Sequence, residues 1–155
     1  MTRRDEIEAY WESTNTVSLL DSNLRMLEES TVLRYLHRNM DFADLGCGGG
    51  ESTVRYAAAV KSCVALEQSG HLRAKAKARI DQAQLTNVEL VAGSVSDLSK
   101  YTNRFDGVLT QRVVINFLSW EEQKAVIENV RSTLKPGGLY VMIEAVRQLS
   151  DHACE

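Results

Sequence analysis

Short runs rich in β-branched residues alternate along the chain with longer segments rich in alanine, leucine and charged residues. The buried-strand candidates are residues 42–45, 62–67, 88–92, 105–110 and 139–145. The segments expected to be helical are residues 3–12, a stretch from 21 or 22 to about 37, 51–60, 69–85, and one that opens at 119. Such alternation is typical of a parallel sheet with helices on both faces. We therefore predict a three-layer α/β/α fold.

Two local signals predict the limits of the last helix. Ser119 and Glu122 have the capping-box spacing, in which each side chain accepts a hydrogen bond from the other residue's backbone amide. Pro136 lacks an amide proton and Gly137 tolerates positive φ, so residues 135–138 are expected to end the helix. The fifth strand then follows at residue 139.

The chain has 155 residues, of which 44% are hydrophobic and 25% are charged. This length predicts a single domain over residues 1–155, with N-terminal helices in 1–38 and the βα core in 39–155. Lysine and arginine total 18 against 21 acidic residues, which gives a net charge of -3. So small a charge does not favour nucleic acid or an anionic membrane as a partner.

Other classes of protein are also disfavoured. No apolar run approaches the ~20 residues of a membrane-spanning helix, and the N-terminus lacks the apolar stretch of a signal peptide. The cysteines show no CxxC spacing and the histidines are scattered, so no disulfide framework and no metal site are expected. These residues are Cys47, Cys63, Cys154, His37, His71 and His152. We predict a cytoplasmic protein.

A cluster of glycines follows the first strand candidate, in the sequence Asp-Leu-Gly-Cys-Gly-Gly-Gly over residues 44–50. Glycines allow a tight turn and a close approach of the backbone to a ligand. The helix behind them directs free amides and the positive end of its dipole to the same place. The pattern therefore predicts a nucleotide-type site.

The spacing of the glycines separates the kinds of nucleotide site. A dinucleotide fingerprint needs a third glycine at 51 or 53, where this chain has Glu51 and Thr53, and the chain contains no P-loop. Asp44 stands two residues before the first glycine, which suits a ligand with a cationic amine better than one with phosphates. Glu67 ends the second strand candidate, 21 residues after Gly46, where an acid accepts hydrogen bonds from ribose hydroxyls in dinucleotide and adenosylmethionine sites alike.

Together with residues 91–98, 105–111 and 134–138, these motifs resemble those of the class I S-adenosylmethionine-dependent methyltransferases, in the family's order and across almost the whole chain. The resemblance implies a Rossmann-like methyltransferase fold with strand order 3-2-1-4-5 and S-adenosylmethionine as the cofactor. The cofactor-binding residues that it implies are Asp44, Gly46, Cys47, Gly48, Glu67, Gln68, Val95, Ser96 and Gln111. Asp97 is an alternative partner for the adenine amine.

The resemblance also implies a reaction, the in-line displacement of a sulfonium methyl by an acceptor held in alignment. The catalytic residues stay unknown, because a general base is needed only when the acceptor arrives protonated. The chain lacks the (D/N)PPY and Pro-Cys motifs of several family branches, and a small-molecule substrate is expected. Arg112 is interpreted either as a ligand for an acidic substrate or as an ion-paired residue. Tyr10 and Trp11 are interpreted either as a lid or as a hydrophobic anchor.

The chain departs from the family pattern after its fifth strand. The family fold has seven strands, and the ten residues 146–155 are too few for strands 6 and 7, which are therefore expected to be missing. A bare edge is then expected on residues 139–145, which predicts self-association. The alternative to an enzyme is a non-catalytic or truncated S-adenosylmethionine-binding module that needs a partner or its missing C-terminal part.

Overall fold

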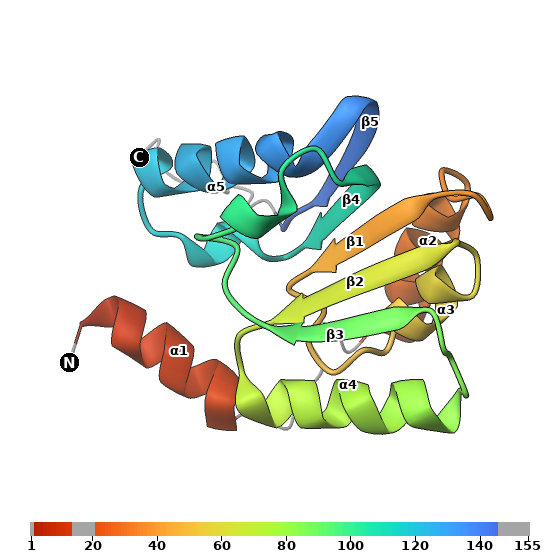
Figure 1. Cartoon of the computed structure of the whole chain (residues 1–155). Helices are drawn as coiled ribbons and strands as arrows, with labels where there is room; N and C mark the ends of the chain where they lie inside the picture. The colour runs from red at the N-terminus through yellow and green to blue at the C-terminus, as the bar shows by residue number, and fades with distance from the viewer. Residues whose placement is uncertain (1, 14–20, 146–155) are drawn as a thin grey trace, which may run out of the picture.

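The structure, a computed structural model, describes residues 2–13 and 21–145. Its centre is a five-stranded sheet in the order β3-β2-β1-β4-β5, with every neighbouring pair parallel. The strands are β1 (Asp41–Leu45), β2 (Ser62–Glu67), β3 (Val88–Ala92), β4 (Phe105–Gln111) and β5 (Leu134–Ile143). The predicted α/β fold and strand order are confirmed (Figure 1).

In the part of the chain that the structure describes, five α-helices and two short 3-10 turns accompany the sheet. The helices are α1 (Arg3–Ser13), α2 (Ser22–Leu33), α3 (Thr53–Ala57), α4 (Gly70–Gln82) and α5 (Trp120–Thr133), and the turns are η1 (Ser99–Tyr101) and η2 (Val114–Asn116). The capping box of Ser119 and Glu122 is formed as predicted. Asp21 caps α2 by accepting hydrogen bonds from the backbone amides of Asn23 and Leu24.

Two hydrophobic cores lie on opposite faces of the sheet. On one face, Val32 of α2 and Tyr56 of α3 pack with Phe42 and Leu109 from the central strands. The core of the other face contains Val108 of β4 and joins it to the apolar stripe of α5. The central strands are thus covered on both sides, as expected for a parallel sheet.

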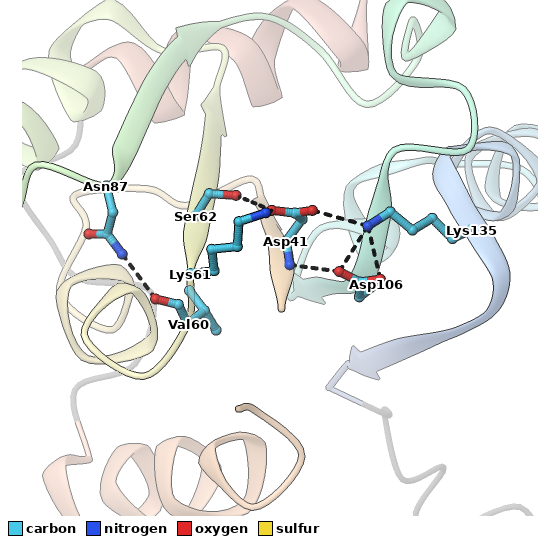
Figure 2. Close-up of polar contacts among 7 residues, drawn as sticks. All are labelled: Asp41, Val60, Lys61, Ser62, Asn87, Asp106 and Lys135. Atoms are coloured by element: carbon cyan, nitrogen blue, oxygen red, sulfur yellow. Dashed lines mark hydrogen bonds and ion pairs between the residues drawn. The ribbon is translucent and has the colours of Figure 1, made fainter. Parts of the chain in front are cut away.

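The helix expected over residues 51–60 is shorter than predicted, because α3 spans only Thr53–Ala57. Beyond α3 the chain tightens into turns of the i to i+3 type, with the Val60 amide donating to Ala57 at 3.4 Å. The side-chain amide of Asn87 donates to the carbonyls of Ala57 and Val60, which satisfies them outside a helix (Figure 2 draws the Val60 bond). The alanine-rich sequence favours a longer helix, but these tertiary bonds end it. The second helix is also shorter, since α2 ends at Leu33 rather than near residue 37.

The fifth strand begins earlier than predicted. Helix α5 does end before the Lys-Pro-Gly-Gly segment, but Leu134 already pairs with Phe105, and Leu139 pairs with Gly107. Two steps along β4 therefore match five steps along β5, so residues 135–138 form an irregular bulge inside the strand rather than a connection before it. Gly137, with φ of 78°, turns the backbone at this bulge.

The bulge places Lys135 in a polar network at the amino-terminal edge of the sheet (Figure 2). Its ammonium contacts the carboxylates of Asp41 and Asp106 at 3.0 Å. Asp41 also accepts a 2.8 Å hydrogen bond from the Ser62 hydroxyl, while its backbone amide donates to Asp106. The network links β1, β2, β4 and β5 at the edge opposite to the glycine loop.

No helix in the described part of the chain combines the length and apolar character needed to cross a membrane. Residues 2–13 and 21–145 also contain no group of three or more histidine, cysteine and acidic side chains that could hold a metal ion. Cys47 and Cys63 are free thiols in the structure. Cys154 and His152 lie outside the described residues.

Candidate cofactor site

The loops that follow β1, β2, β3 and β4 meet at the carboxyl-terminal edge of the sheet, where strand order reverses between β1 and β4. Two adjoining cavities of about 620 and 490 Å³ open there. Gly46, Gly48 and Gln111 line both, as do Trp11, Leu72 and Arg112. The shared lining makes the glycine loop the boundary between the two cavities.

The glycines of this loop serve different physical purposes. Gly46, Gly48 and Gly50 have φ values of 80°, 56° and 78°, a region that side chains disfavour. A Cβ on Gly50 would lie 2.9 Å from the backbone of Ala76, so Gly50 is needed for the packing of α4. A Cβ on Gly48 would meet nothing within 4 Å. The absence of a side chain at Gly48 thus keeps open the space in front of the loop.

The carboxylate of Asp44 lies at the back of the smaller cavity and is 4% exposed. It accepts a 2.7 Å hydrogen bond from the hydroxyl of Thr53, the first residue of α3. Burial raises the pKa of Asp44 to about 6, and the nearby carboxylate of Glu67 adds to the increase. A cationic group in the cavity would favour the charged form of Asp44.

Glu67 ends β2 and faces the larger cavity. Its two carboxylate oxygens accept 2.8 Å hydrogen bonds from the backbone amides of Gly48 and Ser69. Burial raises the pKa of Glu67 above its ordinary value. Each oxygen keeps acceptor capacity for a further donor, as a ribose diol would require. Gln68, the next residue, also lines this cavity.

The turn after β3 contributes different residues from those expected. Val95 lines the larger cavity, but Ser96 lines neither cavity. The backbone amide of Ser96 donates to the Ser94 hydroxyl, and its carbonyl accepts from the Asn129 side chain at 2.8 Å. Ser94 lines the cavity instead, with Gly93 beside it.

The end of β4 is fixed by a carboxylate from α2. Glu28 accepts a 2.6 Å hydrogen bond from the Gln111 amide and forms an ion pair with Arg112. The side chains of Arg112 and Glu28 are only 14% and 13% exposed. Arg112 has a φ of 56°, and its carbonyl accepts a hydrogen bond from the Asn116 side chain. Of the two interpretations of Arg112, the structure therefore has the ion-paired one.

Comparison with known proteins identifies the family. The sequence profile of the methyltransferase domain family matches residues 42–138 of this chain. The chain is a member of the class I S-adenosylmethionine-dependent methyltransferase family. Over 104 residues this chain is 32% identical to an uncharacterized methyltransferase of Synechocystis sp., a match that covers 67% of this chain and 46% of that protein.

A second relative is much larger. This chain is 31% identical over 132 residues to the chondramide synthase of Chondromyces crocatus, and the match covers 83% of this chain and 3% of the synthase. The chain thus spans less than half the length of either relative.

Solved structures share the fold of this chain. The N-methyltransferase NodS of Bradyrhizobium japonicum, solved with S-adenosylhomocysteine, superimposes with a TM-score of 0.74 at 18% identity, over 90% of this chain and 71% of that one. The cyclase SpnF superimposes with a TM-score of 0.73 at 21% identity, over 92% and 53%. At such identities the likeness concerns the fold alone.

Helix α1 supplies the outer wall of the larger cavity. No residue of α1 is buried, and Figure 1 shows the helix standing beside the carboxyl ends of the strands. The carboxylate of Glu12 accepts hydrogen bonds from the backbone amides of Gly70 and His71 at the start of α4. The Trp11 indole donates to Asn116 at 3.4 Å. Trp11 thus lines the site, whereas Tyr10 is 52% exposed.

Proposed function

We propose that this methyltransferase domain binds S-adenosylmethionine at the glycine loop and transfers its methyl group to a small-molecule acceptor. The observation that carries the proposal is the buried Asp44 carboxylate facing a cavity that Gly48 keeps open. A buried acid and a glycine-rich loop fit a ligand whose end is cationic and approaches the backbone closely. The carboxylate of Glu67 stands at the neighbouring cavity, where the ribose would follow.

Each predicted residue takes a part in this arrangement. Asp44 pairs with the ammonium of the methionine end, and the backbone of Gly46, Cys47 and Gly48 encloses that end. Glu67 and Gln68 bind the ribose. Val95 contacts the adenine through its apolar side chain, with the backbone of Ser96 beside it, and Gln111 faces the reacting centre. The outward Ser96 side chain makes Ser94 the better polar partner.

The bound cofactor supplies an electrophilic methyl group, so the protein has to hold the acceptor in line with it. The larger cavity extends beyond the glycine loop to α1, where Ile7, Phe117 and Leu118 add apolar surface. A cavity of about 620 Å³ suits a small molecule rather than a polymer. NodS, which has the same fold, is an N-methyltransferase. The cytoplasm stays the predicted location.

The second candidate function is a binding module without activity of its own. The cyclase SpnF has the same fold, so the fold does not by itself imply methyl transfer. The chain also spans only 46% of its Synechocystis relative, and the acceptor-binding part is the part that varies among sites built on one scaffold. In this alternative the cofactor binds but the acceptor site requires further protein.

Calorimetry and a transfer assay separate the two candidates. We expect the 155-residue chain to bind S-adenosylhomocysteine and not NAD, and the Gly48→Val variant to lose this binding while circular dichroism shows an intact fold. Transfer of labelled methyl from S-adenosylmethionine to a panel of small amines, phenols and carboxylic acids then supports the enzyme. Binding without transfer to any acceptor favours the module. Failure to bind S-adenosylhomocysteine contradicts both.

A further inference from the structure

One face of helix α2 points toward the candidate cofactor site, and this face carries Arg25. Arg25, Glu28, Glu29 and Val32 have the spacing i, i+3, i+4 and i+7, which places them on one face of the helix. Val32 is fully buried and Glu29 is 3% exposed, so this face points inward. Arg25 is half-buried on the same face, one turn before the glutamates, and it lines the smaller cavity.

Two glutamates attach α2 to both sides of the site. Glu29 accepts a 2.7 Å hydrogen bond from Ser52 and forms an ion pair with Arg55, so it holds the segment that follows the glycine loop. Glu28 holds the end of β4, as described above. Because α2 is fixed at these two places, the position of Arg25 over the smaller cavity is also fixed.

The cations that line the smaller cavity are Arg25, Lys75, Arg79 and Arg112. Arg79 pairs with Glu51 at 2.7 Å and donates to the Gly49 carbonyl, and Arg112 pairs with Glu28. Lys75 has an interaction of its own. Within residues 2–13 and 21–145, Arg25 forms no ion pair and donates no side-chain hydrogen bond. Arg25 is therefore the cation of this cavity that the described residues leave available for an anion.

A free amino acid end carries an ammonium and a carboxylate on the same carbon. If Asp44 pairs with the ammonium, the carboxylate lies in the same cavity and needs a cation there. We infer that Arg25 binds the carboxylate of the cofactor's methionine end. This inference rests on the proposed cofactor site, and it adds α2 to the elements that form that site.

The guanidinium is suited to this task, since it presents paired donors to a carboxylate. A hydrogen bond to a charged group changes an affinity by roughly ten- to a hundredfold. We therefore expect Arg25→Ala to weaken S-adenosylhomocysteine binding by at least about tenfold. The affinity of Arg25→Lys should lie between those of Arg25→Ala and the wild type. The free protein should unfold at an unchanged temperature, because Arg25 has no partner to lose.

The test is calorimetry with two ligands that differ only in the carboxylate. S-adenosylhomocysteine and its decarboxylated analogue are titrated into the wild type, Arg25→Ala and Arg25→Lys. Arg34→Ala, an exposed arginine at the other end of α2, is the matched control. Arg25→Ala should weaken the first ligand and leave the analogue unaffected, and Arg34→Ala should alter neither.

Three results would overturn the inference. An equal loss for both ligands means that Arg25 acts on the fold rather than on the carboxylate. An unchanged affinity for S-adenosylhomocysteine in Arg25→Ala removes the assignment, and if that variant then transfers methyl poorly to carboxylate acceptors only, Arg25 serves the acceptor. In both cases the proposed function stands. A wild type that binds neither ligand contradicts the proposed cofactor site itself.

Discussion

The hydroxyl of Thr53 donates a 2.7 Å hydrogen bond to the buried carboxylate of Asp44. This bond joins the end of β1 to the first residue of α3 across the glycine loop. Despite this bond, the pKa of Asp44 is raised to about 6, because burial outweighs the single donor. A cation beside this carboxylate would stabilise its ionised form and lower the pKa again. The pair therefore supports a site prepared for a positively charged ligand.

The raised pKa predicts how the stability of the free protein depends on pH. A folded pKa of about 6 against the ordinary aspartate pKa of 3.8 means that the folded state binds the proton more tightly. This contribution to stability is complete below pH 3.8 and is lost as the pH rises through 6. Asp44→Asn should therefore match the wild type near pH 4 and exceed it by up to about 3 kcal/mol at pH 8. Urea unfolding at both pH values measures the difference, and an equal gain at pH 4 and pH 8 would contradict it.

The same titration predicts the pH dependence of binding. An ammonium pairs with the charged Asp44 and not with its protonated form, so affinity for S-adenosylhomocysteine should fall as the pH drops below 6. Binding near pH 6 should release a proton, which calorimetry in two buffers of different ionisation enthalpy detects. Asp44→Asn should bind weakly at every pH and release no proton from this site. Proton uptake by the wild type would reverse the assignment.

Two glycines of the loop, Gly48 and Gly50, should respond differently to replacement by alanine. Gly50→Ala places a Cβ 2.9 Å from the backbone of Ala76, so α4 must move and we expect a loss of roughly 2–4 kcal/mol in stability. Gly48→Ala meets no atom within 4 Å and costs only the strain of its positive φ, about 1 kcal/mol. Thermal unfolding of the two variants measures this contrast. Equal losses would show that Gly48 is also a packing position.

Glu28 should stabilise the protein through Arg112. Replacing it with glutamine leaves the guanidinium, 14% exposed, without its carboxylate, and we expect a loss of roughly 3 kcal/mol in the free energy of unfolding. The double variant Glu28→Gln/Arg112→Met should recover part of that loss, because it removes the unpaired charge. Denaturant unfolding of the single and double variants tests this coupling, and additive losses would show that the ion pair contributes little.

The sequence predicted the sheet and the glycine loop because both depend on local patterns. Apolar runs indicate the buried strands, and the spacing of Asp44, Gly46 and Glu67 follows from the βαβ unit. Features set by tertiary contacts could not be predicted in this way. The amide of Asn87 helps to end α3 early, and residues 135–138 join β5 because Lys135 finds two carboxylates on other strands.

The site shows the same division between local and tertiary signals. The motif indicated which loop follows β3, but a single hydrogen bond between Ser94 and Ser96 decides which of the two serines faces the cavity. The pairing of Glu28 with Arg112 spans 84 residues, and nothing in the local sequence indicates it. Arg25 becomes a candidate ligand for a carboxylate only because the structure shows that the other cations lining the cavity have partners of their own.

The network of Asp41, Asp106 and Lys135 in Figure 2 predicts that the protein loses stability at acidic pH. The Ser62 hydroxyl and then Lys135 lower the pKa of Asp41 to about 2, so its contribution is present above pH 3.8 and is lost as the pH falls toward 2. Asp41→Asn should cost about 1 kcal/mol at pH 7, a modest value because the side chains are partly exposed. The difference from the wild type should vanish near pH 2. Asp81→Asn, in an exposed helical pair, is the control and should change little at either pH.

The outer edge of β5 leads to the last prediction, which concerns association. Within the described part of the chain β5 pairs with β4 and with no second strand, and Leu139 and Met142 are 37% and 49% exposed. An apolar edge with unpaired backbone groups offers a place for a second copy to add its own strand. Residues 146–155 lie outside the described residues. We expect the 155-residue chain to form dimers or larger species as its concentration rises, and Met142→Lys to suppress them.

Light scattering over a concentration series measures both effects. The control is Leu27→Lys, at an exposed leucine of α2, which should not suppress association. A wild type that stays monomeric at every concentration, with slow exchange of the Val141 and Ile143 amides, would show that the edge is already protected.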